Sequence, residues 1–198
     1  MILKRNQLLI LIKLVFNELN WLKLKGKIKK IKLLVMDVDG VLTDGKLYID
    51  NEGNLMKSFN VKDGLGLKLL MENKVKIAFF SGGSGGATEK RAETLKIDYC
   101  QVGIKNKFTA LSNLQKKLSL TKEETAYIGD DINDIPVKKI VNIFFAPKDA
   151  SNYVLRMCDA ILTNSGGNGA IRELSERILS FKGSLTDIEK KGWLERND

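Results

Sequence analysis

The fold is decided by Ile31-Lys32-Leu33-Leu34-Val35-Met36, which runs directly into Asp37-Val38-Asp39-Gly40-Val41-Leu42-Thr43-Asp44. The first stretch is short, apolar and rich in branched residues, which predicts a strand buried on both faces of a parallel sheet. Gly40 predicts a turn directly after it. In open α/β sheets the functional groups lie beyond the carboxyl ends of the strands, and Asp37 and Asp39 stand at such an end.

The two aspartates predict a metal-assisted site. Two carboxylates so close together repel each other unless a cation or a shared proton relieves them. Mg²⁺ suits an all-oxygen site, because it is a hard ion that prefers carboxylates, carbonyls and water. One of the two carboxylates is then available as a nucleophile.

Two other interpretations of Asp37 and Asp39 have to be weighed. Aspartates at strand ends often cap the following turn or helix without any chemistry. A calcium-binding EF-hand loop requires an oxygen ligand at its fifth position, glycine at the sixth and glutamate at the twelfth. Counted from Asp37, those positions hold Val41, Leu42 and Tyr48, so the calcium interpretation fails.

Composition sets the scale and excludes several chemistries. The chain has 198 residues, 43% of them hydrophobic, which is enough for one domain with a buried core. It contains no histidine, which excludes His-assisted serine or cysteine hydrolysis, phosphohistidine chemistry and histidine-ligated zinc. Cys100 and Cys158 are isolated, which indicates reduced core residues of a cytoplasmic protein.

The basic charge is concentrated at the N-terminus. Residues 1–32 contain nine lysines and arginines against Glu18 alone, so they account for most of the net charge of +9. No RNA- or DNA-binding motif accompanies this segment, and we expect no nucleic-acid partner. We assign residues 1–30 to a basic amphipathic N-terminal extension.

Within that extension, Gln7–Leu24 predicts a helix whose polar stripe holds Lys13, Asn17 and Asn20. Its uninterrupted apolar stretches are too short to span a bilayer, and no small-residue cleavage site follows, which argues against a secretory signal. We expect the helix to pack on the body or on a neighbouring subunit. Contact with an anionic membrane surface is the alternative, because basic amphipathic helices bind such surfaces.

The rest of the chain alternates between predicted strands and helices, which indicates a mainly parallel, doubly wound α/β sheet over residues 31–181. Further strands are predicted at Val75–Phe80, Tyr99–Val102, Ala126–Ile128, Val141–Ala146 and Ala160–Leu162. Helices are predicted at Lys62–Glu72, Ala87–Leu95 and Lys107–Leu118, after Asp134, and after Gly169 to about Leu179. A small β-hairpin is predicted from Lys46–Asp50 and Leu55–Asn60 around Asn51-Glu52-Gly53-Asn54. Residues 182–198 are expected to form a polar tail.

Side chains suited to one reaction recur at the predicted strand ends: Asp37 and Asp39, then Ser81, Lys107, Asp130, Asp131 and Asp134. Each has an ordinary explanation on its own, as a cap, a solvated lysine or part of a turn. Together they supply what phosphoryl transfer requires. They offer a carboxylate nucleophile, a second carboxylate for proton transfer, a metal held from two strands, and a hydroxyl and an ammonium for the phosphoryl oxygens.

In this order, the motifs resemble those of the haloacid dehalogenase-like phosphohydrolase superfamily. The string from Asp37 to Gly45, followed by Phe59–Gly64, is more specifically similar to the 3-deoxy-D-manno-octulosonate 8-phosphate phosphatases and the related nonulosonate 9-phosphate phosphatases. The resemblance covers about Lys32 to Leu179. It implies a cytoplasmic phosphoric monoester hydrolase of lipopolysaccharide biosynthesis. The implied substrate is a 2-keto-3-deoxy sugar acid phosphate, 3-deoxy-D-manno-octulosonate 8-phosphate. A nine-carbon acid 9-phosphate of the N-acylneuraminate type is the alternative substrate.

The resemblance also implies a role for each motif residue. Asp37 would be the nucleophile that forms an aspartyl phosphate, and Asp39 would act first as acid and then as base. Ser81 and Lys107 would bind the phosphoryl group. Mg²⁺ would be held by the Asp37 carboxylate, the Asp39 backbone carbonyl and Asp130, with Asp131 and Asp134 as outer support.

Substrate contacts are implied for Asn60, Val61, Lys62, Asp63, Gly64, Lys68, Gly82 and Arg91. Two positions depart from the resembled family: Gly83 and Asn168 stand where the octulosonate phosphatases usually carry arginine. Arginine binds carboxylates and phosphates in a bidentate manner, so each charged hydrogen bond lost would weaken anion recognition by roughly 1.5–3 kcal/mol. This departure is the reason for the nine-carbon alternative.

The spacing of the motifs leaves no room for a cap domain. Between Asp44 and Ser81 the chain can hold the hairpin and one helix, and the interval from Ser81 to Asp130 is no roomier. A site without a cap is open to water unless something else covers it. We therefore predict a homo-oligomer in which the hairpin leans over a neighbouring subunit's site, and the resemblance implies a homotetramer.

Two non-enzymatic functions are the remote alternatives. A phospho-receiver domain also combines a doubly wound sheet with an acidic cluster, a Ser/Thr and a Lys. Its Lys follows its acidic residues, however, whereas Lys107 precedes Asp130 and Asp131. A catalytically idle partner of a cytidylyltransferase would share the fold, but the intact motif set argues against idleness.

Overall fold

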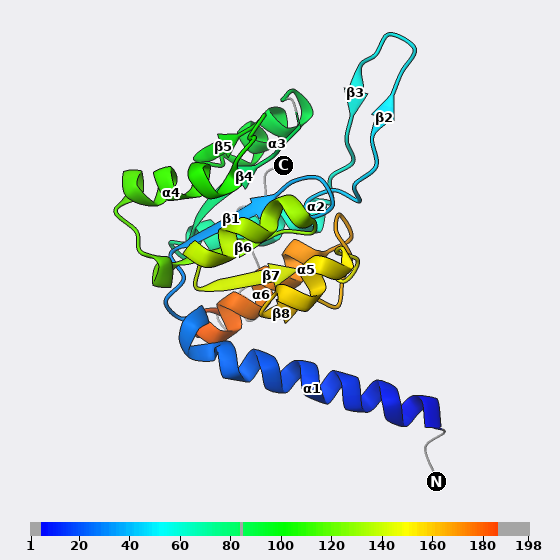
Figure 1. Cartoon of the computed structure of the whole chain (residues 1–198), viewed down its shortest axis with the longest axis vertical. Coiled ribbons are helices and arrows are strands. Elements are labelled where there is room, and N and C mark those ends of the chain that lie inside the picture. The colour runs from blue at the N-terminus through cyan, green and yellow to red at the C-terminus, as the bar shows by residue number, and fades with distance from the viewer. Residues whose placement is uncertain (1–4, 84, 186–198) are drawn as a thin grey trace.

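The computed structural model describes residues 5–83 and 85–185. Its centre is a six-stranded sheet with the order β5-β4-β1-β6-β7-β8, in which every neighbouring pair is parallel (Figure 1). The strands are β1 (Leu33–Asp37), β4 (Lys76–Phe80), β5 (Tyr99–Gln101), β6 (Thr125–Ile128), β7 (Ile143–Ala146) and β8 (Ala160–Ile161). Counted along the chain, the order is third, second, first, fourth, fifth and sixth, which confirms the predicted doubly wound α/β sheet.

The apolar runs form the central strands because both faces of the sheet are covered. Every residue of β1, β6 and β7 is buried. The strand order reverses between β1 and β6, which pair from Leu33 beside Thr125 to Met36 beside Ile128. In doubly wound sheets this switch point is where ligands bind, outside the carboxyl ends of the strands.

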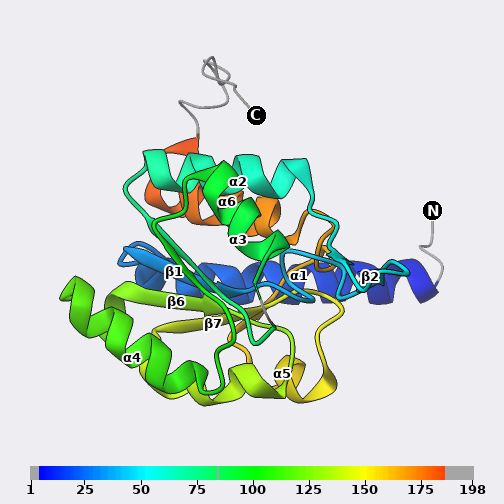
Figure 2. The same cartoon turned by 90° about the horizontal axis from the view of Figure 1, so that it is seen from above.

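Helices cover both faces of the sheet (Figure 2). One face packs against α1 (Arg5–Ile28), α2 (Val61–Glu72), α3 (Ala87–Leu95) and α6 (Ala170–Lys182). The other packs against α4 (Lys107–Leu118), the 3-10 helix η2 (Ile132–Ile140) and α5 (Asn152–Met157), while a 3-10 turn η1 (Lys122–Glu124) precedes β6. Because helices cover both faces of the sheet, the open place for polar groups is its carboxyl edge, where the loops after β1, β4 and β6 lie.

The C-terminal part of α1 belongs to the hydrophobic core. Trp21 is fully buried and stacks on Phe145 of β7, with ring centroids 5.5 Å apart and planes inclined by 12°. Ile28 is also fully buried, and Arg177 of α6 pairs with Glu18 at 2.8 Å. Packing is thus continuous across residue 30, and the division of the chain at residues 30 and 181 stays a prediction. No helix in the described part of the chain is long and apolar enough to cross a membrane.

The hairpin of β2 (Tyr48–Ile49) and β3 (Leu55–Met56) stands away from the body (Figure 1). Asp50 organises its turn, because its carboxylate accepts hydrogen bonds from two backbone N–H groups at 2.9 and 2.8 Å. Ile49 and Met56 are 66% and 57% exposed. Between Asp44 and the start of β4, the structure contains this hairpin and α2.

Several elements differ from the sequence-based expectation. The two hairpin strands are shorter than expected, because their pairing is confined to the residues next to the turn. The helix expected after Asp134 is the 3-10 helix η2, which contains Pro136, a residue without a backbone donor. Helix α5 is too short to show a helical period in the sequence. Helix α6 continues past Leu179 to Lys182, and most of the predicted polar tail lies outside the described residues.

Candidate active site

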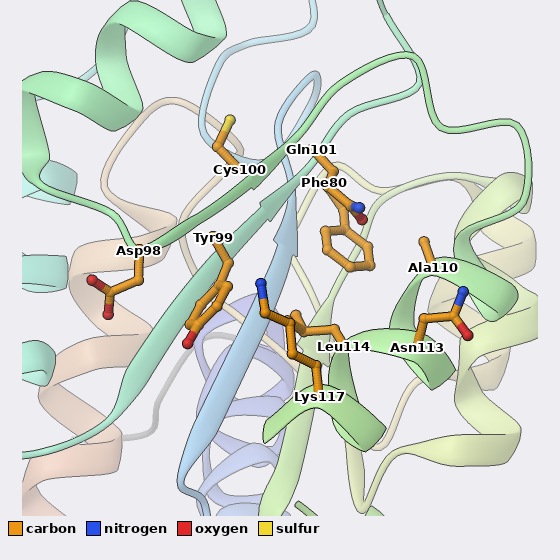
Figure 3. A pocket seen from close by; sticks show the side chains of 9 residues that line it. All are labelled: Phe80, Asp98, Tyr99, Cys100, Gln101, Ala110, Asn113, Leu114 and Lys117. Carbon is orange, nitrogen blue, oxygen red and sulfur yellow. The ribbon is translucent and has the colours of Figure 1, made fainter. Parts of the chain in front are cut away.

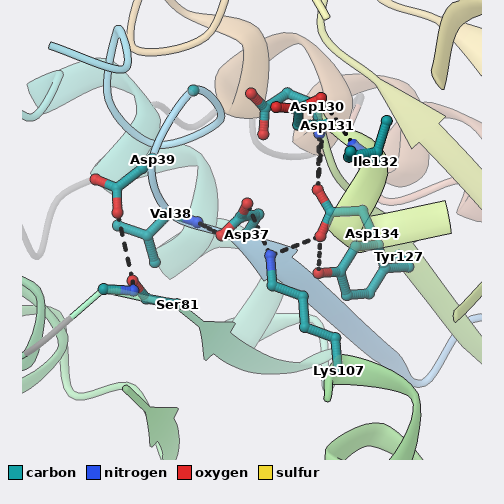
Figure 4. Close-up of polar contacts among 12 residues, drawn as sticks. Asp37, Val38, Asp39, Ser81, Lys107, Tyr127, Asp130, Asp131, Ile132 and Asp134 are labelled. Carbon is teal, nitrogen blue, oxygen red and sulfur yellow. Dashed lines mark hydrogen bonds and ion pairs between the residues drawn. The ribbon is translucent and has the colours of Figure 1, made fainter. Parts of the chain in front are cut away.

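Loops from four strands meet at the carboxyl edge of the sheet, at the switch point between β1 and β6 (Figure 4). Asp37 ends β1, Ser81 follows β4, and Lys107 begins α4 after β5. The loop after β6 supplies the remaining acids, which are Asp130, Asp131 and Asp134. The structure therefore brings the sequence-predicted motif residues into one region.

Asp37, Lys107 and Asp134 form a buried ion-pair network. The Lys107 ammonium lies 2.8 Å from Oδ2 of Asp37 and 2.6 Å from Oδ1 of Asp134. No side chain of the three is more than 7% exposed. Burial lowers the pKa of Lys107, but the carboxylates of Asp37 and Asp134 outweigh this, and the net pKa is raised. Lys107 is therefore a fixed cation beside Asp37.

Asp134 uses both of its oxygens within the protein. Oδ1 also accepts a hydrogen bond from the Tyr127 hydroxyl at 2.6 Å. Oδ2 accepts hydrogen bonds from the backbone N–H groups of Asp130 at 3.0 Å and Asp131 at 3.3 Å. Asp134 thus fixes both the Lys107 ammonium and the loop after β6. The exposed Asp131 caps η2, because its carboxylate accepts the N–H of the following residue at 2.8 Å.

The carboxyl groups of Asp37 and Asp130 both have raised pKa values at this site. Burial is the largest cause that raises the pKa of Asp37 to about 7; the Asp134 carboxylate adds to it, and Lys107 opposes it. The pKa of Asp130 is raised to about 8, first by burial and then by Asp37 and Asp134. A cation bound between these carboxyl groups favours their ionised forms, so protons and metal compete at this place.

The donors present suit a hard divalent cation. One oxygen each of Asp37, Asp130 and Asp134 lie within 4.8 Å of one another. Asp134 is the least available of the three, because both of its oxygens already accept hydrogen bonds. Oδ1 of Asp130, in contrast, is buried and has no hydrogen-bond partner among the described residues. A cation would remove the desolvation cost of that oxygen, so Asp37 and Asp130 fit Mg²⁺.

The Asp39 side chain points towards Ser81, apart from the network around Lys107 (Figure 4). The Ser81 hydroxyl donates to Oδ2 of Asp39 at 3.4 Å and accepts the backbone N–H of Gly83 at 3.1 Å. The ammonium of Lys57 lies 2.7 Å from Oδ1 and 2.8 Å from Oδ2 of Asp39. Asp39 therefore has its own lysine, distinct from the lysine that pairs with Asp37.

Close backbone approaches account for two glycines at the site. Gly40 has a φ of +88°, and a Cβ there would lie 2.1 Å from Oδ2 of Asp130. A Cβ on Gly166 would lie 1.9 Å from the carbonyl oxygen of Gly40. The loop before α6 is thus packed directly on the loop that carries the two aspartates, and side chains at either glycine would separate them.

The sequence-predicted substrate residues surround the start of α2. Asn60 caps this helix, because its side chain accepts the backbone N–H of Lys62 at 2.8 Å. Asp63 is 1% exposed and accepts hydrogen bonds from the backbone N–H groups of Gly169 at 3.3 Å and Arg172 at 2.7 Å. Through these hydrogen bonds, Asp63 stabilises the beginning of α6. Its contact with substrate stays a prediction.

The other predicted substrate residues differ in exposure. Val61 is 57% exposed, while the Arg91 guanidinium lies over the Phe59 ring, 5.7 Å from its centroid. A Cβ on Gly64 would lie 2.4 Å from an Arg91 nitrogen, so glycine makes room for the arginine. The remaining members are Lys62, which is exposed, Lys68, which is half-buried on α2, and Gly82, which is exposed directly after Ser81. Their substrate contacts stay predictions.

A cavity of about 330 Å³ lies between β5 and α4 (Figure 3). Its lining includes Asp98, Tyr99, Leu114 and Lys117. Its described lining includes none of the motif residues. The groups that can carry out phosphoryl transfer therefore lie at the carboxyl edge and not in this cavity.

Sequence reasoning does not find two residues of the site, Lys57 and Tyr127. An aromatic residue within a strand indicates core, and nothing in the sequence shows that the Tyr127 hydroxyl meets Asp134. A lysine in a hairpin is ordinarily solvated, yet the Lys57 side chain is 1% exposed. Neither residue belongs to a spacing pattern, so the tertiary contacts were needed to identify them.

Comparisons with known proteins identify the family of the chain. The haloacid dehalogenase-like hydrolase family matches residues 97–174. The 3-deoxy-D-manno-octulosonate 8-phosphate phosphatase KdsC of Haemophilus influenzae is 42% identical over 160 residues, which cover 81% of this chain and 89% of that protein. The enzyme of the same name from Escherichia coli K12 is 37% identical over 164 residues, covering 83% of this chain and 87% of that protein.

A solved structure adds a bound metal. The 3-deoxy-D-manno-octulosonate 8-phosphate phosphatase of Moraxella catarrhalis, in complex with magnesium, phosphate and KDO, has a TM-score of 0.84 at 35% identity; the match covers 86% of this chain and 98% of that one. The chain therefore belongs to the haloacid dehalogenase-like hydrolase family. Within it, the relatives are the octulosonate 8-phosphate phosphatases, and the chain is, like them, a phosphoric monoester hydrolase whose cofactor is Mg²⁺.

Proposed function

We propose that this phosphatase hydrolyses 3-deoxy-D-manno-octulosonate 8-phosphate, a step of lipopolysaccharide biosynthesis. The observation that carries the proposal is the meeting of Asp37, Lys107 and Asp130 at the switch point, with Asp39 and Ser81 beside them. The similarity to relatives named for this activity supports the choice of substrate.

In the proposed reaction, an Asp37 oxygen attacks phosphorus and forms an aspartyl phosphate while the bond to the sugar oxygen breaks. Asp39 gives its proton to that departing oxygen and then takes a proton from the water that attacks the aspartyl phosphate. The second step breaks the bond between phosphorus and the Asp37 oxygen. The Lys107 ammonium and the Ser81 hydroxyl hold phosphoryl oxygens, which carry more negative charge in the transition state.

Asp37, Asp130 and the Asp39 backbone carbonyl would hold Mg²⁺, which supplies charge neutralisation for the phosphoryl group. Asp134 keeps this arrangement in place through Lys107 and through the backbone of the loop after β6. The high pKa values of Asp37 and Asp130 mean that the site needs the cation for both carboxyl groups to be ionised at neutral pH.

A nine-carbon acid 9-phosphate is the alternative substrate, and two residues favour keeping it. Gly83 lies beside the acid–base group, since a Cβ there would be 3.5 Å from Oδ2 of Asp39. Asn168 is in the loop before α6, next to the glycines that pack on the motif loop. Neither supplies the guanidinium that the resembled phosphatases usually carry, so recognition of the sugar carboxylate must differ here.

Release of inorganic phosphate with Mg²⁺ tests the proposal. We expect the eight-carbon acid 8-phosphate to be hydrolysed with a higher kcat/KM than N-acetylneuraminate 9-phosphate, and chelation to abolish both activities. A reversed order would select the nine-carbon alternative. Phosphate release from neither sugar acid, while p-nitrophenyl phosphate is hydrolysed, would reject both substrates and keep the phosphatase chemistry.

We further propose a cytoplasmic homotetramer in which the hairpin contacts a neighbouring subunit. Leu47, Ile49 and Met56 are 55–66% exposed on an element that stands off the body, and such apolar groups are characteristic of contact surfaces. Sedimentation should give a tetramer, and Ile49→Asp should give smaller species with reduced activity. A fully active monomer at assay concentration would rule out this assembly; fractionation of cells that express the chain tests its location.

A further inference from the structure

Lys57 is a buried lysine that the motifs do not account for. It follows β3 directly, at the base of the hairpin. Its ammonium contacts both oxygens of Asp39, at 2.7 and 2.8 Å, and donates to the hydroxyl of the fully buried Thr88 at 3.3 Å. The side chain is 1% exposed, although the neighbouring Met56 is 57% exposed.

The arrangement restrains the orientation of the Asp39 carboxylate. An ammonium close to both oxygens, together with Ser81 on Oδ2, limits rotation of the carboxyl group about its final bond. General acid–base catalysis depends on the placement of that group, because a proton passes only over hydrogen-bond distance. A carboxylate that lost the Lys57 contact would sample other rotamers, and its average alignment with a departing oxygen would be worse.

We propose that Lys57 is a positioning residue for the acid–base step: it holds Asp39 in place and thereby connects the hairpin with the reaction. This rests on the proposed role of Asp39. A purely structural role is the competing explanation, in which the pair attaches the hairpin to the body and has no effect on proton transfer. The two explanations differ in one measurable respect, the dependence of the loss on the leaving group.

That dependence follows from what the acid does. Phenolate is a stronger base than p-nitrophenolate, so its departure gains more from protonation by Asp39. Phenyl phosphate and p-nitrophenyl phosphate have the same reacting centre and similar shape, and kcat/KM reports the step in which the leaving group departs. Misplacement of Asp39 should therefore harm phenyl phosphate more, whereas a loosened hairpin should harm both esters equally.

The experiment compares Lys57→Met with wild type on these two esters in Mg²⁺. We expect kcat/KM for phenyl phosphate to fall about 100-fold. For p-nitrophenyl phosphate we expect kcat/KM to fall only about tenfold. Asp39→Asn provides the reference for a complete loss of the acid and should show the same preference. Lys46→Met is the matched control, because Lys46 pairs with Asp44 on the same insertion but is 72% exposed.

Two further variants keep the test decisive. Lys57→Gln makes the same comparison with a polar side chain if the methionine variant has lost its native circular dichroism. Lys57→Arg retains a cation and should restore most of the leaving-group dependence of wild type. Equal losses on both esters, or no loss, would overturn the proposal. Inactivity of wild type on every ester would instead contradict the phosphatase chemistry itself, so the two failures are distinguishable.

Discussion

Two lysine–aspartate pairs form at this site, each with a buried lysine, and they are built from different parts of the fold. Lys107 is the first residue of α4, and its partner Asp37 ends the central strand β1. Asp134 holds that lysine from a third element. Lys57, in contrast, comes from the base of the projecting hairpin and pairs with Asp39 in the loop after β1.

The comparison separates a framework part of the site from an inserted part. The Lys107 pair depends on elements that pack on the sheet, so it should stay intact whenever the domain is folded. The Lys57 pair depends on the hairpin, whose two strands pair with each other and not with the central sheet. Its apolar side chains Ile49 and Met56 are exposed. Asp37, the proposed nucleophile, is thus fixed by the core, whereas Asp39, the proposed acid–base group, is held by an element with little support of its own.

Asp37→Asn, at the proposed nucleophile, should produce the largest effect, and it removes one carboxylate partner of Lys107. We expect a fall in turnover of about ten-thousand-fold or more, because an amide cannot form the acyl phosphate. The thermal midpoint in EDTA at pH 8 should not fall, since a buried carboxylate is removed. Exposed Asp98→Asn is the control, and turnover within tenfold of wild type in saturating Mg²⁺ would contradict the assignment.

Lys107→Met should come second, because it leaves two buried carboxylates without their cation. We expect a loss of about 3 kcal/mol in the free energy of unfolding, measured in urea, together with a fall in kcat of roughly 100-fold. Lys105→Met changes an exposed lysine two residues away and should be close to neutral. Unchanged stability of the Lys107 variant would mean that Lys107 does not stabilise the buried carboxylates of Asp37 and Asp134.

The charge state of Asp37 and Asp130 predicts an unusual dependence of stability on pH. Their folded-state pKa values of about 7 and about 8 lie above the unfolded values of about 4, so the metal-free folded protein binds more protons than the unfolded chain. Stability in EDTA should therefore decrease as pH rises from about 4 through 8, and the thermal midpoint should fall with it.

Mg²⁺ should reverse this trend, and thermal melts at pH 6 and pH 8 with and without the ion test it. The cation binds the ionised carboxylates, so its stabilising effect should be larger at pH 8 than at pH 6. Asp130→Asn should reduce both the pH dependence and the response to Mg²⁺. A metal-free protein that becomes more stable towards pH 8 would disprove the charge assignment.

Tyr127→Phe is expected to have the smallest effect on the framework pair. It removes one hydrogen bond to Oδ1 of Asp134, while Lys107 still contacts that oxygen. The loss should be about 1–2 kcal/mol in unfolding free energy, with activity reduced less than tenfold. Tyr153→Phe, at an exposed tyrosine, is the control. A loss as large as that of Lys107→Met would show that the hydroxyl carries more of the network than its single contact indicates.

The sequence predicts the framework part of the site well, because its signals are local. The apolar run Leu33–Met36 ends in Asp37, and the run Ala126–Ile128 ends before Asp130, so strand ends and acids could be aligned by topology alone. The parallel, doubly wound class of the sheet follows from the alternation of strands and helices, whereas its strand order is known from the structure. Lys107 is predicted because it belongs to an ordered set of motif residues.

The inserted part was not predictable for a physical reason: burial of a polar side chain is a tertiary property. Lys57 and Lys46 are both lysines of the hairpin segment, yet one is 1% exposed at the side chain and the other 72%. Asp63 illustrates the same limit, since its motif position does not show that its carboxylate accepts backbone N–H groups at the start of α6; its contact with substrate stays a prediction. Sequence spacing carries no information on either partner.

The stack of Trp21 on Phe145 also gives the molecule a built-in optical reporter. The indole is fully buried, and the Arg177 guanidinium lies 4.6 Å from its ring centroid. The second tryptophan, Trp193, lies outside the described residues. In a Trp193→Phe chain, the fluorescence would come from Trp21 alone, so a red shift of the emission would mark the moment at which the N-terminal helix leaves the sheet.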